Sequence, residues 1–141
     1  MPAIESYLQE VKEYYQFTSP FAGFYYCYSS LEQQWAYYAK YIYSMWHLPT
    51  GQPYLDLQAI LADKDCFVLT TNVDHCFQKA GFDKQRLFYT QGDYGLWQCS
   101  RPCHQKTYDN ETIVKKMVAE QKDRKISSEL IPCCPVCGAP M

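Results

Sequence analysis

The sequence predicts an α/β fold in which a helical layer covers part of an open sheet and a small cysteine-rich module follows. Three observations support this prediction. Residues 65–95 read as strand, polar turn, helix and strand, the first part of the chain is rich in tyrosine and helical periodicity, and two spaced cysteine pairs come after residue 96. We therefore divide the chain into residues 1–95, with a helical segment at 1–62 and a strand–turn–helix–strand unit at 65–95, and residues 96–141.

The helical segment rests on apolar side chains at helical spacing. Ile4, Leu8, Val11 and Tyr15 predict a helix over residues 3–16. A capping box within residues 29–33 opens a second helix, whose apolar face runs from residue 35 to residue 45. Residues 54–61 give a short third helix. The aromatic residues 17–28 show no clear period, so we expect an ordered loop there.

The strand–turn–helix–strand unit is the centre of the prediction. Residues 66–70 are too short for a core helix and read as a strand buried on both faces. Asp74 or Asn72 can cap the helix that follows, through residues 75–80, and Gly81 can end it in a left-handed conformation.

Polar residues follow both predicted strands of this unit. Thr71, Asn72 and Asp74 come directly after the first strand, and Gln91 comes after the second strand, residues 87–90. Open α/β sheets bind ligands at the carboxyl ends of their strands. We therefore expect these groups to face one crevice.

Composition limits the compartment and the partners. No apolar run approaches the roughly 18 residues of a membrane-spanning helix, and the first ten residues carry acids where a signal peptide is basic and then apolar. We expect a cytoplasmic protein without a membrane partner. The formal net charge of −2 gives no reason to expect a nucleic-acid partner.

The cysteines indicate a metal site, because eight cysteines in a cytoplasmic chain stay reduced. Tetrahedral structural zinc takes pairs of thiolates two to four residues apart. The pairs here are Cys99 with Cys103 and Cys134 with Cys137. We predict a four-cysteine structural Zn²⁺ site in a zinc-ribbon module of residues 96–141. Cys133 is also suitably spaced from Cys137, and His104 is an alternative to Cys103.

The unit from Asp65 to Gly95 resembles the sirtuins. Thr71-Asn72-Val73-Asp74 stands where sirtuins have a Gln-Asn-Ile-Asp turn, and Gln91-Gly92 stands where they have the catalytic His-Gly. Gln in place of His is similar to the macrodomain-linked class of microbial sirtuins, which ADP-ribosylate proteins. In the sirtuin pattern a ligand directly precedes Pro-x-Cys, which favours Cys134 over Cys133.

The resemblance implies a partial Rossmann-like, NAD-binding catalytic domain over residues 1–95 and the activity of an NAD-dependent protein ADP-ribosyltransferase. Thr71, Asn72 and Asp74 would bind NAD, and Asn72 and Gln91 would be the catalytic pair. The implied acceptor is a lipoyl-carrier protein similar to the glycine-cleavage H protein, and a macrodomain hydrolase is an implied partner. A Gln amide cannot replace the His base that deacylation needs.

One departure from the family leaves alternatives open. Nothing in residues 1–64 matches the glycine-rich phosphate-binding turn of sirtuins. We therefore expect an internal piece of a sirtuin that binds NAD weakly or not at all by itself. A non-catalytic zinc-binding interaction module and an NAD-dependent protein deacylase are the alternative functions.

Overall fold

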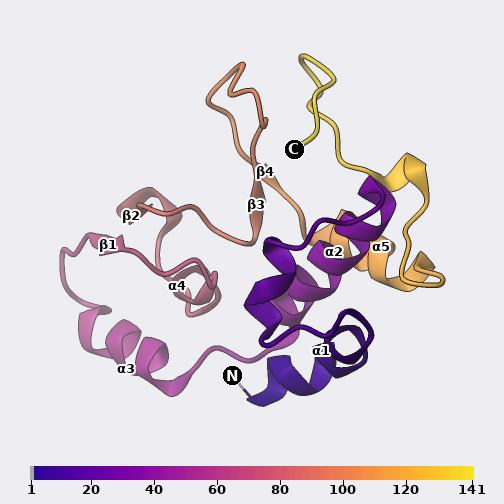
Figure 1. The fold of residues 1–141 in the computed structure, drawn as a ribbon. Coiled ribbons are helices and arrows are strands. Elements are labelled where there is room, and N and C mark those ends of the chain that lie inside the picture. The colour runs from indigo at the N-terminus through magenta and orange to yellow at the C-terminus, as the bar shows by residue number, and fades with distance from the viewer. Residues whose placement is uncertain (1) are drawn as a thin grey trace.

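A computed structural model describes the backbone from Pro2 to Met141 and the side chains from Leu8 onward. Helices and short strands follow one another along the chain (Figure 1). The helices are α1 (Pro2–Tyr15), α2 (Leu31–His47), α3 (Gln52–Leu61), α4 (Cys76–Lys79) and α5 (Glu111–Glu120), and the strands are β1 (Val68–Thr70), β2 (Leu87–Tyr89), β3 (Leu96–Trp97) and β4 (Tyr108–Asp109). Short 3-10 turns lie at Pro20–Phe24, Lys84–Arg86 and Ser128–Leu130.

Helix α2 is the centre of the helical layer, with α1 and α5 packed against it (Figure 1). Ser30 caps its first turn by accepting a hydrogen bond from the Gln33 backbone N–H, as the predicted capping box requires. One face of α2 packs on Leu8 and Val11 of α1, and another packs on Met117 of α5. The predicted helix over residues 3–16 and the predicted second helix, opened by the capping box within residues 29–33, are thereby confirmed.

Aromatic rings fill the space between the helices and the turn that follows β2. Phe24 packs edge-on against Tyr41, with ring centroids 4.7 Å apart, and Tyr94 lies 5.2 Å from Tyr41. These contacts attach the strand-end turn to α2. The abundant tyrosines therefore form a packed layer rather than a disordered segment.

Two small sheets complete the described fold. Strands β1 and β2 pair in parallel, with Val68 opposite Leu87 and Thr70 opposite Tyr89. Strands β3 and β4 pair antiparallel, and the loop between them rises beside the C-terminal loop (Figure 1). The parallel pairing sets the ends of β1 and β2 side by side, as the two predicted strands require.

The prediction that the first strand is buried on both faces is wrong. Leu69 of β1 is 69% exposed, and its register partner Phe88 of β2 is 56% exposed. Only the opposite face of the pair is covered, since Leu87 is buried. The apolar run predicted the strand correctly, but no described element packs over its second face.

The helix after β1 is also shorter than predicted. It covers Cys76–Lys79, because His75 adopts a left-handed φ of 59° and lies outside it. Gly81 has a φ of +91°, as predicted for the residue that ends the helix. None of the helices from Pro2 onward has the length and apolarity that crossing a bilayer requires.

Candidate active site and metal centre

Four cysteine sulfurs gather where the β3–β4 loop meets the C-terminal loop. Cys99 and Cys103 come from the first loop, Cys134 and Cys137 come from the second, and all four Sγ atoms lie within 4.8 Å of one another. Cys99 Sγ lies 3.5 Å from Cys137 Sγ, and Cys103 Sγ lies 3.6 Å from Cys134 Sγ. Both pairs predicted from spacing are therefore brought together at one point.

Backbone hydrogen bonds hold the two loops in this arrangement. The Ser100 N–H donates to the Pro140 carbonyl at 3.1 Å and joins the loops directly. Within the second loop, the Gly138 N–H donates to the Cys134 carbonyl at 2.9 Å, and Gly138 has a φ of +71° that favours glycine. The turn thus aims both of its sulfurs at the first loop.

The donor set fits zinc. Zinc–sulfur bonds of 2.3 Å in a tetrahedron place sulfurs about 3.8 Å apart, close to the separations found here. Backbone N–H groups, first that of Cys103, lower the pKa of Cys99 to about 6, whereas loss of solvent followed by a hydrogen bond with Cys137 raises the pKa of Cys103 to about 12. A divalent cation would allow all four thiolates to coexist.

Cys133 and His104, the two alternatives in the sequence, lie at the margin of this cluster. Cys133 is exposed and outside the four-sulfur group, whereas Cys134 is 2% exposed and within it. His104 Nδ1 lies 3.0 Å from Cys103 Sγ, and its Nε2 lies 2.9 Å from the Tyr108 hydroxyl. His104 is thus placed to hydrogen-bond a ligand sulfur, as groups around structural metals commonly do.

The polar turn after β1 lines a cavity of about 430 Å³. Thr71, Asn72 and Asp74 form one side of it, and residues from α2 and the segment after it form much of the other. The Cys76 N–H donates to Asp74 Oδ1 at 3.0 Å, but the N-cap position of the helix is occupied by His75 and not by the predicted Asp74 or Asn72. The three residues expected to bind NAD thus share one concave surface.

Tyr54 of α3 joins two of these side chains, and the sequence patterns did not single it out. Its hydroxyl donates to Asp74 Oδ2 at 2.6 Å and accepts from Asn72 Nδ2 at 2.7 Å. Burial, followed by the hydrogen bond to Asp74, raises the pKa of Tyr54 to about 12. Its position, eleven residues before the strand unit begins at Asp65, carries no motif, so only the folded contact reveals it.

Gln91 lies at the end of the neighbouring strand but lines a different cavity. The Thr90 N–H donates to the Thr70 carbonyl at 2.9 Å, so the two strand ends are adjacent. Gln91 is exposed and faces a space of about 590 Å³ that residues of β3, among others, also line. The expected single crevice is therefore two cavities, one on each strand end.

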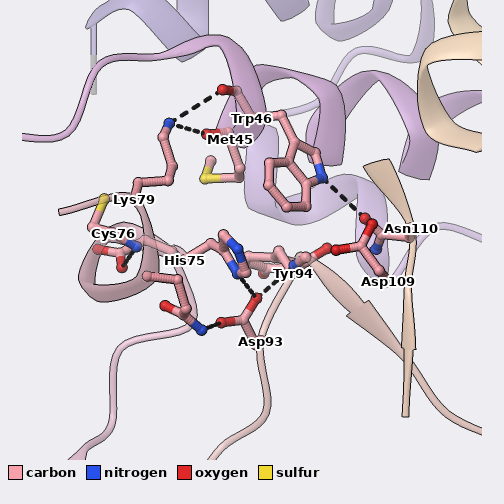
Figure 2. A network of polar contacts seen from close by, with 12 residues as sticks. Met45, Trp46, His75, Cys76, Lys79, Asp93, Tyr94, Asp109 and Asn110 are labelled. Carbon is pink, nitrogen blue, oxygen red and sulfur yellow. Dashed lines mark hydrogen bonds and ion pairs between the residues drawn. The ribbon is translucent and has the colours of Figure 1, made fainter. Parts of the chain in front are cut away.

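A His–Asp pair ties these two strand-end turns together (Figure 2). His75 Nδ1 lies 2.7 Å from Asp93 Oδ1, and the Gly95 N–H donates to the same oxygen at 2.6 Å. Gln78 Nε2 donates to Asp93 Oδ2 at 2.5 Å. A Cβ at position 95 would lie 2.5 Å from His75 Nδ1, so the close approach requires glycine. His75 is structural in this arrangement.

Polar contacts join the end of helix α2 to α4, which follows the first strand-end turn, and to Tyr94, which follows the second (Figure 2). Lys79 donates to the carbonyls of Met45 and Trp46 at 2.8 and 3.2 Å, near the carboxyl end of α2. Trp46 Nε1 donates to Oδ1 of the fully buried Asn110 at 2.9 Å, and Asn110 donates to the Tyr94 carbonyl. The cavity walls therefore come from segments held in a fixed relation.

Comparison with known proteins gives two results. No family model matches the sequence. A protein ADP-ribosyltransferase of Staphylococcus aureus (strain Mu50 / ATCC 700699) is 41% identical over 115 residues, which are 81% of this chain and 36% of that protein. The chain thus spans about a third of the relative's length.

A solved chain from a structural study of sirtuin substrate affinity matches the fold with a TM-score of 0.56 at 22% identity. The match covers 89% of this chain and 47% of the solved chain. At this identity the likeness concerns the fold alone.

Proposed function

We propose that this chain, which is homologous to a protein ADP-ribosyltransferase and has a sirtuin-like fold, forms part of an enzyme that transfers ADP-ribose from NAD to a protein. The observation that carries the proposal is the 41% identity to a protein of that activity, combined with the cavity that Thr71, Asn72 and Asp74 line. A concave site with a few convergent polar groups at a strand end is the usual setting for a small ligand.

The reaction divides into bond cleavage and capture. The bond between ribose C1′ and the nicotinamide nitrogen breaks, and its electron pair leaves with nicotinamide. An acceptor nucleophile then bonds to C1′ and releases a proton. Asn72 would hydrogen-bond the ribose, and Asp74 would accept from the nicotinamide carboxamide. Such fixed polar groups accelerate the step by holding the reacting bond in position.

Gln91 separates transfer from deacylation. A carboxamide has no titratable group near neutral pH, so it cannot take a proton from a ribose hydroxyl as a His base can. It can still orient the ribose or the acceptor by hydrogen bonding. The side chain is exposed at the strand end beside Thr70, where an incoming protein can reach it. We therefore favour ADP-ribose transfer over deacylation.

The remaining parts of the proposal concern the partners. We propose a lipoyl-carrier protein of the glycine-cleavage H type as the acceptor and a macrodomain hydrolase as the enzyme that reverses the modification. Zn²⁺ on the four cysteines would hold the β3–β4 loop to the C-terminal loop. Because no glycine-rich turn occurs in residues 1–64, the NAD pyrophosphate would be bound by polypeptide outside this chain.

The test uses the longest polypeptide that contains this chain. It is incubated with NAD and either a lipoyl-carrier protein or an acetyl-lysine peptide, and the products are weighed by mass spectrometry. We expect the carrier to gain ADP-ribose, a macrodomain hydrolase to remove it, and the peptide to keep its acetyl group. Robust deacetylation with Gln91 intact would overturn the proposal.

Variants locate the chemistry within the chain. Asn72→Ala and Gln91→Ala are expected to lower transfer, whereas Gln85→Ala, an exposed glutamine before β2, is the matched control and should retain it. Equal transfer by all three variants would remove the assigned roles. If no preparation transfers ADP-ribose to the lipoyl-carrier protein, the proposed acceptor is rejected.

A further inference from the structure

Helix α3 meets the candidate NAD site through one side chain. None of its residues is buried, and Leu55, Leu57 and Ile60 are exposed. Tyr54, in its first turn, packs edge-on against Phe77 of α4 with ring centroids 4.9 Å apart. The same ring carries the hydroxyl that contacts Asp74 and Asn72. The contacts of Tyr54, rather than a buried helix face, therefore attach α3 to the site.

The hydrogen bonds around this hydroxyl have only one consistent direction. The Asp74 Oδ2 atom accepts from this hydroxyl, so the single hydroxyl proton is directed at Asp74. Its contact with Asn72 must then be an accepted bond, and only the Asn72 amide nitrogen can donate it. The carbonyl oxygen of the Asn72 carboxamide consequently lies on the side away from Tyr54. Without the hydroxyl, nothing in this network distinguishes the two orientations of the amide.

We propose that Tyr54 is a positioning residue that fixes the Asn72 carboxamide with its carbonyl oxygen free to accept from a ribose hydroxyl of NAD. This inference rests on the proposed function for the identity of the ligand. It adds a residue that acts through Asn72 and Asp74 rather than on the reacting atoms. The bridge also leaves Asp74 with both oxygens engaged, Oδ1 by the Cys76 N–H and Oδ2 by Tyr54, so the carboxylate cannot rotate freely.

The first experiment detects the hydrogen bonds of Tyr54 with Asp74 and Asn72 without NAD and without an activity measurement. The 141-residue chain is labelled with ¹⁵N, and its side-chain amide signals are compared between wild type and Tyr54→Phe, which keeps the ring on Phe77. We expect the Asn72 amide protons to shift and to exchange faster with water in the variant. Asn110, the other asparagine of the chain, donates to the Tyr94 carbonyl and serves as an internal control whose signals stay unchanged.

The second experiment measures the kinetics of ADP-ribose transfer by the longest polypeptide that contains this chain. Tyr54→Phe is expected to lower kcat for ADP-ribose transfer on the order of 10-fold to 100-fold, because a misplaced group near the reacting bond has effects of that size. The KM for NAD should change far less, since the loss is in orientation. Tyr25→Phe, at a residue 75% exposed, is the matched control and should behave as wild type.

The two readouts separate this inference from the proposed function. If wild type transfers no ADP-ribose, the proposed function fails, while the amide signals still decide whether Tyr54 orients Asn72. Unchanged Asn72 signals in Tyr54→Phe would overturn the bridge. Changed signals with unchanged kcat in an active preparation would overturn the positioning role.

Discussion

The four-cysteine cluster and the parallel strand pair are both small, but they are stabilised in different ways. Around the cluster, Cys99 and Cys134 are 1% and 2% exposed and pack with the buried Ala139. In the strand pair, Leu69 and Phe88 are 69% and 56% exposed on one face. A metal can hold a short segment that has too few apolar residues for a core, whereas a parallel sheet needs cover on both faces.

The cluster and the strand pair differ in how much polypeptide each needs. The loops of the cluster carry within this chain every ligand that a tetrahedral zinc takes. The strand pair belongs to a chain that covers only 47% of the solved chain whose fold it matches. We therefore expect the metal centre to be self-sufficient in the 141-residue chain, and the strand-end site to reach its full function only in a longer polypeptide.

The largest expected effect follows from metal removal. Binding of structural zinc contributes on the order of 10 kcal/mol to small modules, so a strong chelator should unfold the loops around residues 99–108 and 132–141. Helix α5, which packs on α2, should lose less of its structure. Zinc per chain and amide hydrogen exchange measure both outcomes. A folded sample with zinc stoichiometry near zero would remove the metal site.

A second prediction distinguishes neighbouring cysteines. Cys134→Ser removes a sulfur of the cluster and should release the metal, whereas Cys133→Ser changes an exposed sulfur outside it and should not. Each variant is purified without added metal and its zinc content is measured. Release by Cys133→Ser with retention by Cys134→Ser would reverse the assignment of the ligand.

A third prediction compares the two faces of the strand pair by a leucine-to-alanine substitution on each face. Leu87→Ala empties a buried site and should cost about 2–5 kcal/mol of unfolding free energy. Leu69→Ala changes a side chain on the bare face and should cost less than about 0.5 kcal/mol in the 141-residue chain. Urea unfolding of the zinc-loaded chain measures both. Equal losses would mean that the bare face is covered in solution.

The sequence predicted those features that depend on local chemistry. Cysteine spacing predicted four sulfurs that lie together, because each turn holds its own pair of residues. The Asp74 contact with the Cys76 N–H and the left-handed Gly81 follow from preferences of single residues. The capping box placed the start of α2 for the same reason.

Features that depend on packing could not be predicted. The apolar run at residues 66–70 indicates a strand, but the cover over each face comes from other segments, so the exposure of Leu69 was missed. Gln91 and Asn72 follow adjacent strands, yet the pleat and the following turns direct them to separate cavities. Tyr54 reaches the site only through the path of the chain around α3. Periodicity carries no information on that path.

The most direct test of the central claim is the release of nicotinamide from NAD. The longest polypeptide that contains this chain is incubated with NAD and acceptor, and free nicotinamide is quantified over time for wild type, Asn72→Ala and the control Gln85→Ala. We expect wild type and control to release nicotinamide at similar rates and Asn72→Ala to be slower on the order of 100-fold, because the ribose loses a group that positions the breaking bond. Release at the wild-type rate by Asn72→Ala would contradict the account, because the cavity after β1 would then not be where NAD is cleaved.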